Sequence, residues 1–166
     1  MAGRAYTLTI WAALILAVLV PIIAAVNSPL LAWRDAIYII AGLAGIAGLG
    51  VLLLQPLLAG GFLPGLSRYN GLRVHRVSGA LLVVLVIVHV AGLWITSPPD
   101  VVDALLFVSP TPFSVWGVLA MWAIFAAALL AASRKRLRLA PRLWRRAHLG
   151  LAVLTVGGTV LHAVLI

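Results

Sequence analysis

The chain reads HRVSGALLVVLVIVH at residues 75–89 and HLGLAVLTVGGTVLH at residues 148–162. Each stretch is an apolar run with a histidine at both ends, and together they contain all 4 histidines of the sequence. With their apolar extensions, such runs are long enough for a helix that crosses the hydrocarbon core of a bilayer. Both stretches therefore predict transmembrane helices with a histidine toward each side of the membrane.

The composition of the whole chain agrees with this prediction. Of its 166 residues, 64% are hydrophobic and 9% are charged. Soluble domains are usually about 45–50% apolar and about 25% charged, and a globule of this size could not hide so much apolar surface from water. We therefore expect lipid to be the solvent of the chain, and an all-α integral membrane bundle to be its fold class.

Five apolar runs approach the roughly 20 residues that a transmembrane helix needs. They lie near residues 8–26, 37–58, 77–95, 113–132 and 149–166. Runs of this length favour helices over barrel strands, and the first exceeds the apolar core of about 7–15 residues in a secretory signal. We expect a single domain over residues 1–166, with a short amphipathic segment at 100–107 along the membrane surface.

Charged residues between the spans predict the orientation. Arginines and lysine concentrate in the second-to-third and fourth-to-fifth connections, whereas the third-to-fourth connection carries only Asp100 and Asp103. Because Lys and Arg in short loops remain on the cytoplasmic side, the N-terminus is predicted inside and the C-terminus outside. This topology also explains the formal net charge of +9, so we expect membrane lipid and not nucleic acid as a partner.

The available side chains restrict the chemistry to histidine. The absence of cysteine excludes disulfides, thiolate ligands and iron–sulfur clusters. The three carboxylates, Asp35, Asp100 and Asp103, all lie outside the apolar runs. Paired-carboxylate hydrolases, hard-cation sites and proton-coupled transporters are therefore disfavoured, because they need carboxylates in the site or in the spans.

The histidines form two sets with the same spacing of 14 positions, His75 with His89 and His148 with His162. Fourteen residues are close to four helical turns, so both histidines of a helix share one face, about 21 Å apart. The third and fifth spans run parallel because one span separates them. His75 and His148, the inner histidines, then share the cytoplasmic level, and His89 and His162, the outer histidines, share the opposite level. Two imidazoles on facing helices are suited to axial ligation of haem iron.

Other roles compete with haem ligation. A histidine near a lipid headgroup, such as His75, is unremarkable, but His89 lies inside a span, where a polar side chain is costly and indicates a function. Zinc is disfavoured because it needs tetrahedral closure, and each level offers two histidines without cysteine or carboxylate. Another metal or a proton relay is the minor alternative. Small residues such as Gly79 and Ala152 fit a porphyrin or close helix packing equally well.

Two segments resemble a known family. They are LRVHRVSGAL at residues 72–81, continuing to VHV at 88–90, and WRRAH at 144–148, continuing to VLH at 160–162. They resemble the third and fifth helices of the ferric reductase-like transmembrane domain superfamily, which includes ferric reductases, NADPH oxidases and bacterial relatives. The resemblance covers the five spans in order and orientation, and its specific part is the two histidine pairs.

The resemblance implies a domain that carries electrons across a membrane through two stacked haem b groups (iron-protoporphyrin IX). His75 and His148 would hold the inner haem, and His89 and His162 the outer one. We expect an integral protein of the bacterial inner (plasma) membrane. No catalytic side chain is expected, because the protein contributes the positioning and tuning of haem.

The sequence departs from the family in one respect. Family members usually add a sixth helix and a domain that binds FAD and NAD(P)H, whereas this chain ends four residues after His162 and has no G-x-G-x-x-G unit. We therefore expect electrons from a separate cytoplasmic flavoprotein or NAD(P)H dehydrogenase. We also expect a homo-oligomer or an extra membrane subunit to cover the flank where a sixth helix would lie.

Basic residues near the inner histidines have two interpretations. Arg76 could pair with a haem propionate, because guanidinium matches carboxylate geometry, or it could serve only as a topological charge. The basic run at residues 134–146 could dock an acidic flavoprotein or contact anionic lipid. Trp144, at a span end, fits an aromatic belt.

Three functions are compatible with these features. The leading interpretation is the haem subunit of a ferric reductase-like oxidoreductase, which passes electrons from a cytoplasmic donor to a ferric chelate, oxygen or quinone outside. A second is the haem-bearing membrane subunit that feeds a periplasmic methionine sulfoxide reductase. Those relatives commonly lack the first histidine of the third helix, so His75 argues against it. A third is a haem-binding assembly or sensor protein without redox function, for which two haems across the bilayer would be needless.

Overall fold

The computed structural model describes residues 2–166, and every regular element in them is helical. Five of the helices are long and apolar enough to cross a membrane: Gly3–Val26, Ala36–Gly60, Arg68–Thr96, Pro112–Ala132 and Pro141–Leu165. Large apolar side chains are exposed along all five, as expected of helices whose solvent is lipid. The prediction of an all-α integral membrane protein with five spans is confirmed.

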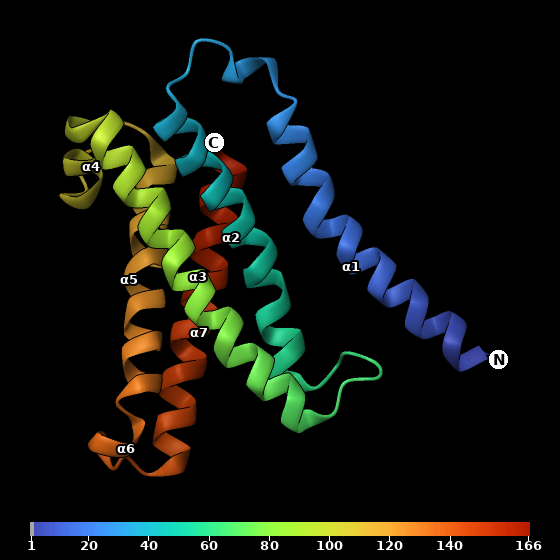
Figure 1. The fold of residues 1–166 in the computed structure, drawn as a ribbon. Helices are drawn as coiled ribbons and strands as arrows, with labels where there is room; N and C mark the ends of the chain where they lie inside the picture. Colours follow the sequence, from blue (N-terminus) through green and yellow to red (C-terminus); the bar gives the residue numbers. More distant parts are fainter. Residues whose placement is uncertain (1) are drawn as a thin grey trace. The chain divides into compact units, whose positions relative to one another are not determined.

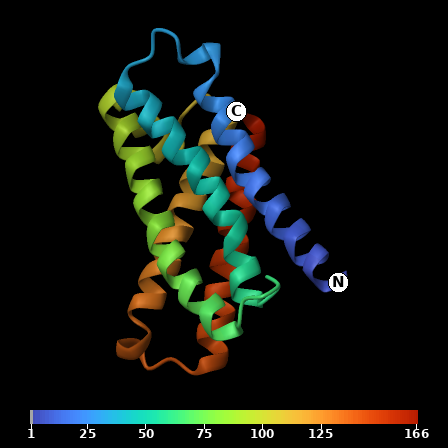
Figure 2. The same ribbon diagram turned by 45° about the vertical axis from the view of Figure 1, so that its right-hand side comes forward.

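The chain divides after Thr96 into two compact units. The first unit contains α1 (Ala2–Val26), the short 3-10 helix η1 (Pro29–Leu31), α2 (Ala36–Gly60) and α3 (Arg68–Thr96). α2 and α3 pack along each other as an antiparallel pair (Figures 1 and 2). Gly61 ends α2 with a φ of 73°, a left-handed conformation that glycine adopts without steric cost. The chain can therefore turn directly from α2 toward α3.

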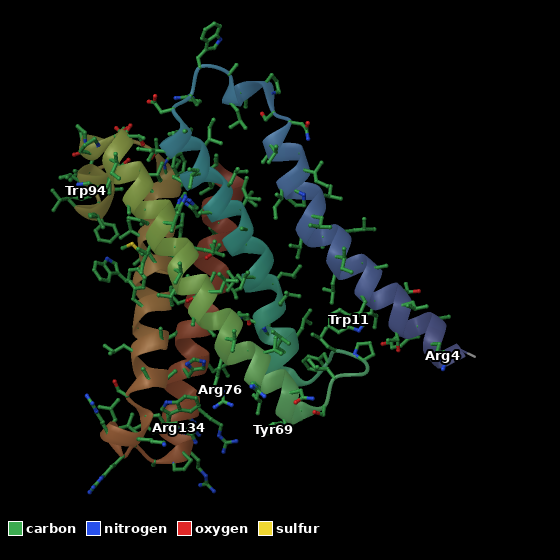
Figure 3. The ribbon with its side chains drawn as sticks, in the orientation of Figure 1. Arg4, Trp11, Tyr69, Arg76, Trp94 and Arg134 are labelled. Carbon is green, nitrogen blue, oxygen red and sulfur yellow. The ribbon has the colours of Figure 1, made fainter. Side chains whose placement is uncertain are left out.

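α1 contacts both α2 and the loop that joins α2 to α3. A Cβ on Gly50 of α2 would lie 2.9 Å from Val18 Cγ1, so the approach of α1 depends on a glycine. Nearer the start of α1, the Trp11 indole N–H donates to the Pro64 carbonyl oxygen at 3.1 Å. Figure 3 shows Trp11 beside the loop that joins α2 and α3. Most other side chains of α1 are exposed, in keeping with a lipid-facing helix.

The second unit contains α4 (Pro98–Leu105), α5 (Pro112–Ala132), α6 (Arg134–Leu137) and α7 (Pro141–Leu165). α5 and α7 form another antiparallel pair and lie side by side in both views (Figures 1 and 2). A Cβ on Gly158 would lie 3.0 Å from the Trp116 carbonyl oxygen, so the two backbones approach closely. The amphipathic segment predicted after the third span is confirmed as α4, with Asp100 in its first turn.

Three helices begin before the apolar runs that predicted them, and the first of these, α1, begins at Ala2 and not near residue 8. α3 begins at Arg68 and not near residue 77, and α7 begins at Pro141 and not near residue 149. A scan for apolar residues stops at the first charges, whereas helical hydrogen bonding continues through arginine, which is a good helix former. The inner histidines, His75 and His148, therefore lie within their helices and not at the helix ends.

Candidate functional site

The four histidines lie on two helices, one in each unit. α3 carries His75 and His89, and α7 carries His148 and His162. Both helices are uninterrupted between their histidines, so the two histidines of each helix share one face, as the spacing predicted. Pairing of α3 histidines with α7 histidines joins residues of different units, and it stays a prediction.

The ring of His89 is held by the backbone of α2. Its Nδ1 lies 2.8 Å from the Ala41 carbonyl oxygen. A carbonyl oxygen can only accept a hydrogen bond, so Nδ1 carries the hydrogen and donates it. In a neutral ring the lone pair then lies on Nε2, the nitrogen that can coordinate a metal. Histidine ligands of metals generally have this arrangement, with the other ring nitrogen donating to a carbonyl or carboxylate.

The ring of His162 has the same arrangement in the other unit. Its Nδ1 lies 2.9 Å from the carbonyl oxygen of Phe113, near the start of α5. The Phe113 side chain also meets the imidazole edge to face, with ring centroids 5.6 Å apart and planes at 69°. By the same argument Nδ1 donates, and the lone pair of the neutral ring lies on Nε2. Both outer histidines thus donate Nδ1–H to a backbone carbonyl of the preceding long helix, which is the arrangement that histidine ligands of metals generally have.

His148 is oriented by an aromatic neighbour on its own helix. The Trp144 ring stacks on the His148 ring, with centroids 5.1 Å apart and planes at 8°. The Trp144 indole N–H donates to the Leu130 carbonyl oxygen of α5 at 3.2 Å. The Arg134 guanidinium lies 4.6 Å from the centre of the Trp144 ring, a cation–π contact. Arg134, Trp144 and His148 therefore form a continuous stack at the basic end of the second unit.

A polar pair lies close to His75 in the first unit. The Gln55 side-chain N–H of α2 donates to Ser78 Oγ at 2.8 Å, and the Ser78 hydroxyl donates to the Val74 carbonyl oxygen at 2.7 Å. Gln55 also corresponds to His75 in helix register, because both lie 14 positions from the contacting pair Ala41 and His89. Gln55 is therefore a polar side chain within an apolar helix, in the part of α2 that corresponds to His75.

Arg76 follows His75 on α3 and is exposed. Figure 3 shows it projecting from the part of α3 that precedes the long apolar run, with Tyr69 nearer the start of the helix. An exposed guanidinium beside a candidate ligand is available to an anionic group. Its contact with a haem propionate stays a prediction.

Sequence reasoning identified the histidines and missed the groups that orient them. The acceptors for His89 and His162 are main-chain oxygens of Ala41 and Phe113, which no side-chain pattern reveals. The sequence could have identified Trp144 as a neighbour of His148, because it precedes His148 by four positions and so lies on the same helix face. The sequence could also have identified Gln55, because it is an amide within an apolar run.

The donor set fits haem iron better than a compact metal site. Among residues 2–166, no group of three or more His, Cys, Asp or Glu side chains comes together as a metal cluster. Zinc ordinarily needs such a cluster, whereas haem iron needs only axial ligands because the porphyrin supplies the rest. Imidazoles that present Nε2 while Nδ1–H is bonded to a carbonyl are suitable axial ligands.

The fold and these histidines define a class, that of helical membrane proteins with histidines in their membrane-spanning helices. A family model described as "Ferric reductase like transmembrane component" matches residues 41–159, and the chain belongs to this family. Transmembrane domains of this family generally bind haem and serve in electron transfer across membranes. No curated protein and no solved structure matches the chain.

The matched region extends from α2 into α7. It includes His75, His89 and His148, and it ends three residues before His162. The assignment of His162 as a candidate ligand therefore depends on its spacing from His148 and on its hydrogen bond to Phe113.

Proposed function

We propose that this protein carries electrons across a membrane through two bis-histidine b-type haems, as the haem subunit of a reductase. The observation that carries the proposal is the repeated geometry at His89 and His162, each donating Nδ1–H to a carbonyl of the preceding long helix. Membership of the ferric reductase-like family supports the same function. The coordinating nitrogen of each outer histidine would then be Nε2.

The inner haem would be held by His75 and His148, and the outer haem by His89 and His162. Residues 1–166 would act as one domain, with the N-terminus in the cytoplasm and the C-terminus outside, in a bacterial inner membrane. Bound haem would supply reversible one-electron chemistry. The protein would hold and orient the ligands: α2 and α5 fix the outer histidines, and Trp144 fixes the ring plane of His148.

Electrons would enter at the basic side of the molecule. Arg134, Lys135, Arg136, Arg138, Arg142, Arg145 and Arg146 are all exposed in the second unit. Such a surface attracts an acidic partner and steers its approach. The donor would be a separate cytoplasmic flavoprotein or NAD(P)H dehydrogenase. Electrons would leave near the outer histidines to an external acceptor such as a ferric chelate, oxygen or quinone.

Arg76 would assist at the inner level. Its exposed guanidinium follows His75 directly on α3 and matches the geometry of a propionate carboxylate. In this role Arg76 would hold the porphyrin in place while His75 and His148 ligate the iron.

Counting the haems tests this proposal. Purified wild-type protein should contain two haems per chain by pyridine haemochrome, and His75→Ala and His89→Ala should each contain one. Asn70→Ala is the matched control, because Asn70 is an exposed residue of the same helix, and it should keep both haems. A wild-type protein without haem would refute the proposal, as would histidine variants that keep the full amount.

A further inference from the structure

Each outer histidine ring rests against a glycine of the neighbouring helix. A Cβ on Gly45 of α2 would lie 2.9 Å from His89 Nδ1 and 3.1 Å from its Cε1. A Cβ on Gly117 of α5 would lie 2.7 Å from His162 Nδ1 and 2.9 Å from its Cε1. The space that a side chain would fill at these two positions is therefore occupied by the imidazole rings.

The same arrangement occurs in both units. The acceptor carbonyl and the glycine are four positions apart on one helix, as Ala41 with Gly45 and as Phe113 with Gly117. Four positions are about one helical turn, so the two groups lie on one face and meet the same ring. The acceptor residues differ, alanine in one and phenylalanine in the other, while the glycine is the same. This points to the missing side chain as the feature that both sites need.

A side chain at either glycine would displace the ring. Contacts shorter than 3.0 Å cannot persist, and the imidazole is the movable partner because the helix backbone is fixed by its own hydrogen bonds. If the imidazole moves away from the glycine, its Nδ1–H also moves away from the carbonyl oxygen, because the glycine and the carbonyl lie one turn apart on the same helix face. Glycine is otherwise unfavourable inside a helix, and it here permits a hydrogen bond that alanine would disturb.

The inner level has no glycine at the corresponding positions. Residues 59 and 131, which lie 14 positions beyond Gly45 and Gly117, are both alanine. Fourteen positions is also the interval from the outer to the inner histidines. The glycine arrangement therefore distinguishes the outer level from the inner level in both helix pairs.

We propose that Gly45 and Gly117 are positioning residues of the outer haem site. They let His89 and His162 donate Nδ1–H to the Ala41 and Phe113 carbonyl oxygens, so that Nε2 of each ring would be the nitrogen that holds the haem iron. The hydrogen bond also makes the imidazole a stronger electron donor, which favours oxidised iron and lowers the reduction potential. This inference rests on the proposed function, in that it takes His89 and His162 as the ligands of one haem.

The test compares Gly45→Ala and Gly117→Ala with Gly42→Ala. A Cβ added to Gly42 of α2 would have no atom within 4 Å, so this variant controls for the loss of a helix glycine. Purified full-length proteins are assayed for haem content by pyridine haemochrome, for the midpoint potential of each haem by redox titration, and for low-spin signals by EPR. The inner haem reports in each sample whether the protein is folded.

Gly45→Ala and Gly117→Ala should bind the outer haem about 10–100-fold more weakly, the range typical when a group behind a metal ligand is lost. The outer haem that is retained should have a raised midpoint potential and an altered EPR signal, and the inner haem should be unchanged. Gly42→Ala should match the wild type. If the wild type contains two haems and the glycine variants behave like Gly42→Ala, the role of the glycines is refuted while the proposed function stands. Equal loss of both haems in the glycine variants would also refute that role, and wild-type protein without haem would overturn the proposed function as well.

Discussion

At the scale of single residues, the neighbours of His89, His162 and His148 hold the rings in two ways, by a main-chain carbonyl or by an aromatic stack. The outer histidines are fixed by main-chain carbonyls of a neighbouring helix. His148 is fixed by a stack in which Trp144 lies between its ring and the Arg134 guanidinium. A carbonyl fixes both the tautomer and the direction of a ring, whereas a stack fixes mainly the ring plane. Substitutions that remove the stack should therefore affect the inner haem and spare the outer one.

Replacing Trp144 tests this difference. Trp144→Leu removes the aromatic stack, which is worth about 0.5–1.5 kcal/mol, so the inner haem should bind up to about tenfold more weakly. Trp144→Phe keeps an aromatic ring beside His148, so its haem content should lie between those of Trp144→Leu and the wild type. Haem content and the spectrum of the inner haem are the measurements. Trp122→Leu is the control, because Trp122 lies on α5 with 57% of its surface exposed. Equal haem contents of Trp144→Leu and Trp122→Leu would contradict the role of Trp144 in orienting His148.

At the scale of helices, each unit is built on one antiparallel pair that packs through small residues. The buried positions of α2 and α5 include Ala41, Ala44, Ala120 and Ala123. Lipid is as apolar as the side chains, so close van der Waals contact contributes most to the association of such helices. Added volume in these interfaces should therefore separate the helices and lower stability.

Two adjacent glycines of α7 offer a matched test. A Cβ on Gly158 would meet the Trp116 carbonyl oxygen at 3.0 Å and the Ala120 Cβ at 3.2 Å, whereas nothing lies within 4 Å of one on Gly157. Gly158→Ala should destabilise the protein by about 1–3 kcal/mol, as overpacking does. Gly157→Ala should be neutral or stabilising, because alanine is the better helix former. Thermal unfolding in detergent, followed by circular dichroism, measures both. A Gly158→Ala variant as stable as Gly157→Ala would contradict the close packing of α5 and α7.

The positions of the long helices were predicted from the sequence better than the contacts between them. Hydropathy predicted the five spans because each long helix contains an apolar run. It missed the starts of α1, α3 and α7, because arginine continues a helix but interrupts an apolar run. It also missed the acceptors at Ala41 and Phe113, which lie 48 and 49 positions from their histidines. Such contacts depend on how two helices pack against each other, and the periodicity of a single helix does not predict that packing.

At the scale of the whole molecule, charge is distributed unevenly along the chain. Basic residues gather in the segment from Arg134 to Arg146, while the connection around α4 carries Asp100 and Asp103. By the positive-inside rule, the basic segment would lie on the cytoplasmic side. A concentrated positive surface also speeds the approach of an acidic electron donor. Topology and docking would then depend on the same residues.

Removing charge from this segment tests the docking role. The double variant Arg138→Gln and Arg142→Gln should slow haem reduction by a reduced flavodoxin, an acidic flavoprotein, by about tenfold at low salt. Raising the salt concentration should slow the wild type toward the variant, because ions screen exposed charges. Stopped-flow absorbance of the haems gives both rates. Arg34→Gln, between α1 and α2, serves as the control and should leave the rate unchanged. Equal rates for the double variant and the wild type at low salt would contradict docking at this segment.

In the proposed function, the chain conducts electrons from one side of a membrane to the other. The most direct measurement uses sealed vesicles that contain the haem-loaded protein and a trapped, impermeant ferric chelate, with an impermeant reductant added outside. Wild-type vesicles should reduce the trapped chelate, and vesicles containing His89→Ala should not, because one haem of the path is lost. Reduction of the wild-type haems, with the trapped chelate staying as oxidised as in protein-free vesicles, would contradict electron transfer across the membrane by this protein.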